Sequence, residues 1–162
     1  MADSVNLLIS ILVRYPEIAK ISYDADNNTI KLTFFFSGTL TEDRFAATRK
    51  VLTDSLEVFH LLEGANTRVV DIAFSTCAEV TMLTILRDVT SLSKGEIALV
   101  IQLLRDNCNG FLIADDNEAL QEEDLMVQDE VIDSMLENVK HQQQSNGLIG
   151  IREDGRVLVF NQ

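Results

Sequence analysis

Residues 29–36, Thr-Ile-Lys-Leu-Thr-Phe-Phe-Phe, are the stretch of sequence that decides the fold. The apolar side chains that alternate onto one face of this stretch are Ile30, Leu32, Phe34 and Phe36, while Phe35 faces the other way. This period of two, in a segment rich in aromatic residues, predicts a half-buried β-strand. The elements on either side of the strand then limit the folds that the chain can adopt.

From this strand onward, residues 29–115 are expected to run in the order strand, helix, strand, strand, helix, strand. Thr41 is a favourable N-cap for a long helix, and Gly64 is a favourable residue to end it. Apolar residues at helical spacing predict the buried stripe of this helix. The stripe consists of Phe45, Leu52, Leu56, Phe59 and Leu62.

Three further strands are expected at residues 68–75, 79–87 and 111–114. The first two are joined by a tight connection at residues 75–78. Ser93 and Glu96 have the spacing of a capping box, which predicts that a second helix begins there and carries the apolar run 97–104.

The ends of the chain add elements to this unit. At the N-terminus, Asp3 can cap a helix that Pro16 ends, and a short strand at 18–23 leads into the turn 24–28, which is rich in Asp and Asn. At the C-terminus, a helix is clearest over residues 129–142. Its apolar side consists of Val131, Ile132, Met135, Leu136 and Val139. Segments 148–151 and 156–160 then flank Glu-Asp-Gly, a hairpin signal.

This order predicts an α+β fold with a ferredoxin-like (split βαβ) sheet and helices on one face. An N-terminal helix-strand and a C-terminal acidic helix with a β-hairpin are added to it. Residues 1–115 are expected to form the core, and residues 116–162 an appendage packed on the core or on a second subunit. One conflict stays open, because the strand 18–23 should pair with 29–36, which already has two neighbours in that topology. Either the N-terminal strand is peripheral, or the sheet order is different.

The charge balance excludes some functions. The chain of 162 residues has 26 acidic and 13 basic residues, a formal charge of −13, and ten acids without a base lie between Asp115 and Glu137. Direct binding to nucleic acid or to an anionic membrane surface is therefore not expected. The apolar stretch 5–13 is too short for a membrane span and lacks the basic flank of a signal peptide. Two cysteines without a disulfide framework suit the cytoplasm.

Two surfaces are candidate sites. In the split βαβ arrangement the loops 37–41, 75–78 and 107–110 fall at one end of the sheet, where small polar side chains and thiols could hold a ligand. The candidate ligand-binding residues are Ser37, Thr39, Thr41, Ser75, Cys77 and Cys108. The other candidate is the acidic face of the C-terminal helix, which could dock a basic protein partner or could simply be solvated. Its residues are Asp129, Glu130, Asp133 and Glu137.

No catalytic, metal or cofactor motif is recognised. A zinc site would need Cys77, Cys108, His60 and His141, and none of these stands at a ligand-pair spacing. The turn 24–28 resembles the start of a calcium loop, but Thr29 and Phe35 occupy the positions that require Gly and Glu. The expectation is therefore no metal, no cofactor and no catalytic residue.

Three classes of function remain. The first is a cytoplasmic interaction or regulatory protein without catalytic activity, with a protein partner, possible homodimerisation and no contact with nucleic acid or membrane. The second is a small-molecule sensor with its ligand at the loop end described above. The third is an enzyme whose active site is completed across a dimer interface.

Overall fold

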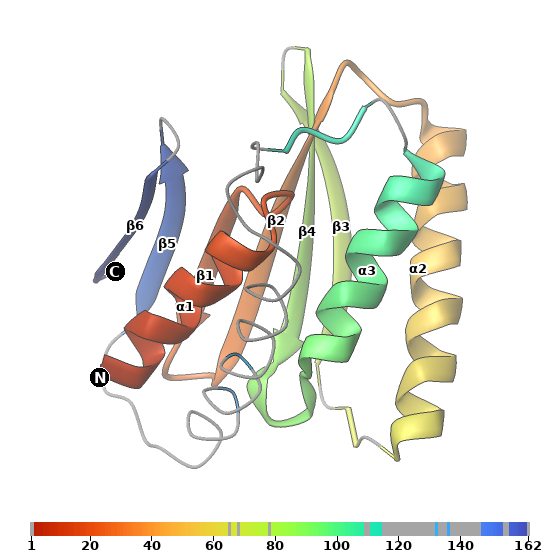
Figure 1. Cartoon of the computed structure of the whole chain (residues 1–162). Helices are drawn as coiled ribbons and strands as arrows, with labels where there is room; N and C mark the ends of the chain where they lie inside the picture. The colour runs from red at the N-terminus through yellow and green to blue at the C-terminus, as the bar shows by residue number, and fades with distance from the viewer. Residues whose placement is uncertain are drawn as a thin grey trace.

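The computed structural model describes residues 2–64, 66–67, 69–77, 79–108, 111–114, 132, 136, 147–153 and 156–161. These residues form an α+β fold in which three α-helices accompany a six-stranded antiparallel sheet (Figure 1). The helices are α1 (Ala2–Arg14), α2 (Glu42–Glu63) and α3 (Lys94–Asn107). The strands are β1 (Lys20–Asp24), β2 (Thr29–Ser37), β3 (Val70–Cys77), β4 (Val80–Asp88), β5 (Leu148–Glu153) and β6 (Arg156–Asn161).

The sheet order is β3-β4-β2-β1-β5-β6, and every neighbouring pair is antiparallel. The strand predicted from residues 29–36 is β2, and it lies near the middle of the sheet. Its pairing with β4 covers its whole length, from Thr29 opposite Asp88 to Ser37 opposite Val80. The predicted hairpins β1–β2 and β5–β6 are both present.

The open question about the N-terminal strand is answered at the other edge of β2. There β1 pairs with residues 29–33, and residues 111–113 take the remaining part through the isolated bridge between Phe36 and Leu112. The strand expected at 111–114 is therefore reduced to one bridge, and β1 is not peripheral. Strand β4 lies between β2 and β3, as a split βαβ unit requires, but the complete ferredoxin-like arrangement is not confirmed.

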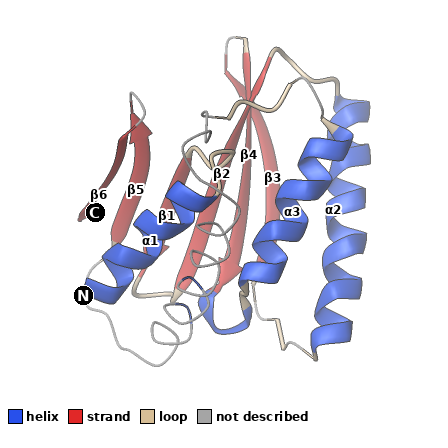
Figure 2. Ribbon diagram, in the orientation of Figure 1, coloured by secondary structure: helices blue, strands red, loops and turns tan. Residues whose placement is uncertain are grey.

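The described helices cover a single face of the sheet (Figure 2). Residues directly opposed in an antiparallel sheet point to the same face, and one such row runs through Ile85, Leu32, Ile21, Gly150 and Val159. A Cβ added to Gly150 would lie 2.9 Å from a Leu12 methyl group, so α1 packs on this face. The ring of Phe45 on α2 stacks on Phe74, which belongs to the same face.

The opposite face of the sheet is not covered by any described helix. It exposes several large apolar side chains. Phe111 and Ile113 are two of these, because Leu112 lies opposite Phe36 and points to the helix face, so that its two neighbours in the chain point to the open face. The exposed apolar residues of this open face are Val80, Phe111, Ile113, Leu158 and Phe160, at 38–48% exposure. These residues lie in two places, Val80, Phe111 and Ile113 around the end of β2, and Leu158 and Phe160 on the edge strand β6.

Long helix α2 begins and ends as predicted. The Thr41 side chain accepts a hydrogen bond from the Arg44 amide, and Gly64 ends the helix in the left-handed region at φ 66°. The prediction of the buried stripe is confirmed at Leu52 and Leu56, but the stripe continues at four-residue spacing to Thr48 and His60, which were not expected on it. Leu62, expected on the stripe, is 80% exposed.

The C-terminal acidic helix lies largely outside the described residues. Of residues 129–142, the structure describes Ile132 and Leu136, which are helical and fully buried in the hydrophobic core. These two residues belong to the apolar side predicted for that helix. The acidic residues Asp129, Glu130, Asp133 and Glu137 are outside the described part of the chain.

Candidate functional site

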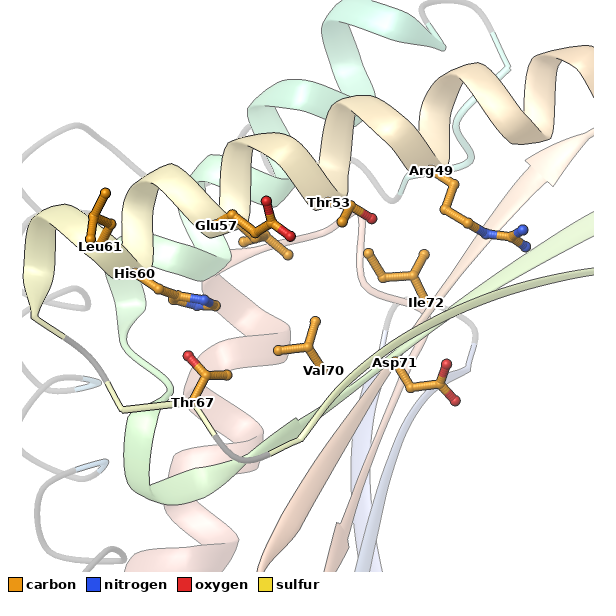
Figure 3. A pocket seen from close by; sticks show the side chains of 10 residues that line it. Arg49, Thr53, Glu57, His60, Leu61, Thr67, Val70, Asp71 and Ile72 are labelled. Carbon is orange, nitrogen blue, oxygen red and sulfur yellow. The ribbon is translucent and has the colours of Figure 1, made fainter.

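A groove of about 620 Å³ runs between α2 and the edge strand β3 (Figure 3). Its apolar lining consists of Leu56, Leu61, Val70 and Ile72, and its polar lining includes Arg49, Glu57 and His60. Leu61 is 80% exposed and Val70 is 42% exposed, so these two side chains are accessible to solvent, whereas Leu56 is buried beneath them. The groove is thus an open apolar channel with charged groups placed along it.

The groove follows the outer edge of β3. Its lining includes Val70 and Ile72, which point to the helix-covered face of the sheet, and Asp71, which points to the opposite face. The Asp88 amide donates to the carbonyl of Val69, so Val69 forms main-chain hydrogen bonds to β4. Because every second residue of an antiparallel strand bonds to the same neighbour, Asp71, Ala73 and Ser75 also bond to β4. By that alternation, Val70, Ile72 and Phe74 direct their main-chain N–H and C=O groups away from β4. These groups open toward the groove.

A buried charged cluster lies beside the groove. Arg87 on β4 is fully buried and donates to both carboxylate oxygens of Glu96 on α3, at 2.5 and 2.7 Å. A second carboxylate, that of Asp88, accepts from Arg87 at 2.5 Å. The Nε2 atom of His60 on α2 lies 2.5 Å from Glu96 Oε1. The cluster therefore ties α2, α3 and β4 together through charge-assisted hydrogen bonds.

Glu96 and Arg87 fix the orientation of the His60 ring. Its Nε2 atom lies 2.5 Å from Glu96 Oε1 and 3.2 Å from a terminal nitrogen of the Arg87 guanidinium group. None of the described residues gives Nδ1 a hydrogen bond, and the ring, 8% exposed, points into the groove near Thr67 and Val70 (Figure 3). The groove thus contains one oriented imidazole nitrogen beside its apolar lining.

The cluster keeps its charges despite burial. Burial alone would lower the pKa of Arg87, but the hydrogen bond and charge of Glu96, with the charge of Asp88, raise that pKa above its ordinary value. Burial alone would raise the pKa of Asp88, but hydrogen bonds from Ser91, the Val69 amide and Thr90, with the Arg87 charge, hold it far below its ordinary value. Arg87 and Asp88 are therefore ionised at neutral pH.

At the loop end predicted as a ligand site, hydrogen bonds join the loops to one another. The Gly38 amide donates to the Glu79 carbonyl, the Ser37 amide to the Phe111 carbonyl, and Arg44 to the Asn107 carbonyl. Thr41 serves as the cap of α2. Ser75 and Cys77 belong to β3 rather than to a connection, since β3 runs to Cys77 and β4 begins at Val80.

The remaining candidates of this end differ in accessibility. Ser37, Thr39 and Ser75 are exposed. Cys108 is fully buried 4.0 Å from the Thr48 hydroxyl, and burial raises the pKa of its thiol. A ligand at this end stays a prediction, and it would have to contact the exposed hydroxyl groups rather than Cys108.

The turn 24–28 is a hairpin turn, as predicted. Asp24 accepts hydrogen bonds from the Asp26 amide and the Asn27 side chain, which lowers its pKa. Among the residues that the structure describes, no three His, Cys, Asp or Glu side chains stand together as a metal site. No helix in the described part of the chain is both long and apolar enough to cross a membrane.

Sequence reasoning missed the Arg87–Glu96 pair. Two signals were present: Arg87 continues the buried alternation Leu83, Ile85 on β4, and Glu96 holds the third position of α3. The capping box forms only in part, because the Ser93 hydroxyl accepts from the Glu96 amide while the Glu96 carboxylate binds Arg87 and His60. A charged residue in the buried phase of a strand was therefore a usable indication of a buried partner.

Comparison with known proteins identifies no relative of this chain. No protein-family model, no curated protein and no solved structure matches the chain. The function has to be argued from the groove, the strand edges and the charges of the chain itself.

Proposed function

We propose that this protein is a non-catalytic interaction module that binds an extended peptide segment of a protein partner in the groove between α2 and β3. The observation that carries the proposal is the outer edge of β3, whose main-chain groups at Val70, Ile72 and Phe74 have no strand partner among the described residues. An extended peptide can add to such an edge as a further strand, and main-chain hydrogen bonds then supply much of the affinity.

The lining of the groove supports an apolar peptide. Successive side chains of an added strand point alternately to the two faces, so every second residue would enter the space beside Leu56 and Leu61. Leu61, which lines this space at the end of α2, exposes 80% of its surface. Covering it would remove apolar surface from water, a gain of about 25 cal/mol per Å².

The charged and hydrogen-bonding groups of the groove further limit which peptide sequences would bind. Glu57 and Asp71 outnumber Arg49 among the charged residues of the groove, which favours a neutral or basic peptide. The predicted docking of a basic partner on Asp129, Glu130, Asp133 and Glu137 would act in the same direction. His60 offers an oriented ring nitrogen, Nδ1, which fits a peptide residue with a hydroxyl or amide side chain.

The proposal is tested by selecting a random peptide library on the purified chain and measuring the affinity of the selected peptides by fluorescence anisotropy. We expect sequences with apolar residues at every second position. Val70→Asp should weaken binding at least about tenfold, since it places a charge on the apolar wall. Val80→Asp is the matched control, because Val80 has a similar exposure of 38% but lies on the open face.

A second variant tests the strand edge itself. Ile72→Pro removes the N–H group that points outward and leaves the hydrogen bonds to β4 intact, a position where an edge strand tolerates proline. We expect this variant to fold and to lose peptide binding. A failure to select any peptide, or equal loss of binding in the Val70→Asp and Val80→Asp variants, would overturn the proposed function.

A further inference from the structure

The second edge of the sheet is β6, which has no strand partner on its outer side among the described residues. Natural edge strands are usually blunted by proline, lysine, a bulge or a covering element. The β6 sequence Arg-Val-Leu-Val-Phe-Asn contains no proline or lysine, and its ladder with β5 is regular over all six pairs. Leu158 and Phe160 are 44% and 48% exposed on the open face of the sheet.

The main-chain groups at this edge can be assigned. The Arg152 amide donates to the carbonyl of Ala19, so Arg152 and Gly150 bond toward β1. Ile149 and Ile151 then bond to Phe160 and Leu158 on β6. The main-chain groups of Val157 and Val159 therefore point out of the sheet, and no described residue pairs with them.

We propose that a second copy of this chain pairs with β6 in antiparallel fashion, joining two sheets into one. The pairing centres on a two-fold axis at Val159, which opposes Val159 against its own copy and brings residues 157–161 of both copies into the ladder. In this register Leu158 lies opposite Phe160 of the second copy on the open face, and the contact occurs twice. Aromatic and aliphatic pairs of this kind stabilise antiparallel ladders.

Two observations favour a second copy over a different partner. An antiparallel edge is complementary to itself, so a two-fold axis satisfies both strands at once. The hairpin also allows two copies to approach without net repulsion between their hairpins. Residues 148–161 contain two acids and two bases and have no net charge, in a chain of formal charge −13.

The other edge is less suited to such pairing. At β3 the helix α2 lies alongside the edge, and a second copy would bring its own α2 into the same groove. The β6 contact is therefore separate from the peptide groove. It can hold or fail independently of the proposed function.

The test measures the mass of the full chain by sedimentation over a range of protein concentrations. We expect the wild-type chain to shift from one to two chain masses, and Leu158→Glu and Phe160→Lys each to weaken the dimer at least about tenfold, because each places a charge against an apolar side chain. Val80→Glu, on the same open face but far from β6 in the sheet order, should dimerise as the wild type does.

Mixing the two variants tests the register. Leu158→Glu and Phe160→Lys chains should form a heterodimer, since the new carboxylate faces the new ammonium group across the two-fold axis. Circular dichroism confirms that each variant is folded, which is expected for substitutions at exposed positions. A single chain mass at every concentration up to about 1 mM, or no heterodimer in the mixture, would overturn the proposal.

Discussion

At the scale of single residues, Glu96 is the group on which the buried cluster depends. Its carboxylate neutralises Arg87 and orients His60, and all three side chains are buried. Removing one partner of a buried ion pair typically costs about 3–5 kcal/mol, because the other charge stays in the interior. We therefore expect Glu96→Ala to lower the free energy of unfolding by about 3 kcal/mol or more in urea denaturation.

The control for this substitution is an ion pair of the same type at the surface. Lys50 and Asp54 lie 2.9 Å apart on α2 with side chains 77% and 58% exposed. Such pairs contribute little, since water screens them. Asp54→Ala should leave the urea midpoint nearly unchanged, and comparable losses in the two variants would show that burial of the cluster has no energetic consequence.

Asp88 makes the stability dependent on acid. Its pKa is held far below the ordinary value, so its stabilising contribution is complete above the unfolded pKa of about 3.9 and is lost as the pH falls toward the folded pKa. The thermal midpoint should therefore fall below about pH 4. Asp88→Asn should have a lower midpoint at neutral pH and a flatter profile in acid. Parallel profiles for the two proteins would contradict this assignment.

Cys108 should be inert as a thiol. It is fully buried, and the raised pKa keeps it protonated. In a Cys77→Ser background, where Cys108 is the remaining cysteine, a thiol reagent should react slowly with the native chain and rapidly after denaturation. Fast reaction under native conditions would mean that the region around Cys108 and Thr48 opens.

At the scale of elements, local signals predicted what local interactions control. Thr41, Gly64 and Ser93 were read correctly as helix ends because capping depends on a few adjacent residues. The partner of β2 could not be read in this way. Both β1 and residues 111–113 suit the same edge, and the nine residues of β2 are long enough to accept both.

The site was hidden for the same reason. His60, Arg87 and Glu96 come from three elements, with His60 and Glu96 separated by 36 positions in the chain. No motif spacing connects residues that only the packing of α2 and α3 on β4 brings together. The groove likewise depends on the position of α2 along the edge of β3. The helical periodicity of the α2 sequence does not predict that position.

The packing of α1 on β5 depends on Gly150. A Cβ at this position would lie 2.9 Å from methyl groups of both Ile21 and Leu12, which are fully buried. Overpacking of this kind costs about 1–3 kcal/mol. Gly150→Ala should therefore lower the urea midpoint without changing the m-value, and an unchanged midpoint would mean that α1 moves freely on the sheet.

At the scale of the whole molecule, the C-terminal hairpin is continuous with the N-terminal elements. β5 pairs with β1, and Arg152 donates hydrogen bonds to the carbonyls of Leu12 and Tyr15 at the end of α1 and of Ile18 in the connection to β1. A cation beside these last carbonyls is favourable at the end of a helix. Segments from the two ends of the chain therefore stabilise each other across the sheet.

This continuity predicts cooperative unfolding. Because the ladder runs without interruption from β3 to β6 over one core, loss of either edge exposes the core beneath the next strand. Hydrogen exchange measured at increasing denaturant should show the amides of β4 and β5 merging into one opening event. The circular dichroism transition should have the same midpoint as that exchange. An early, separate transition of β5 and β6 would instead indicate that the hairpin is an independent appendage, and Arg152→Ala should then leave the stability of the remaining strands unchanged.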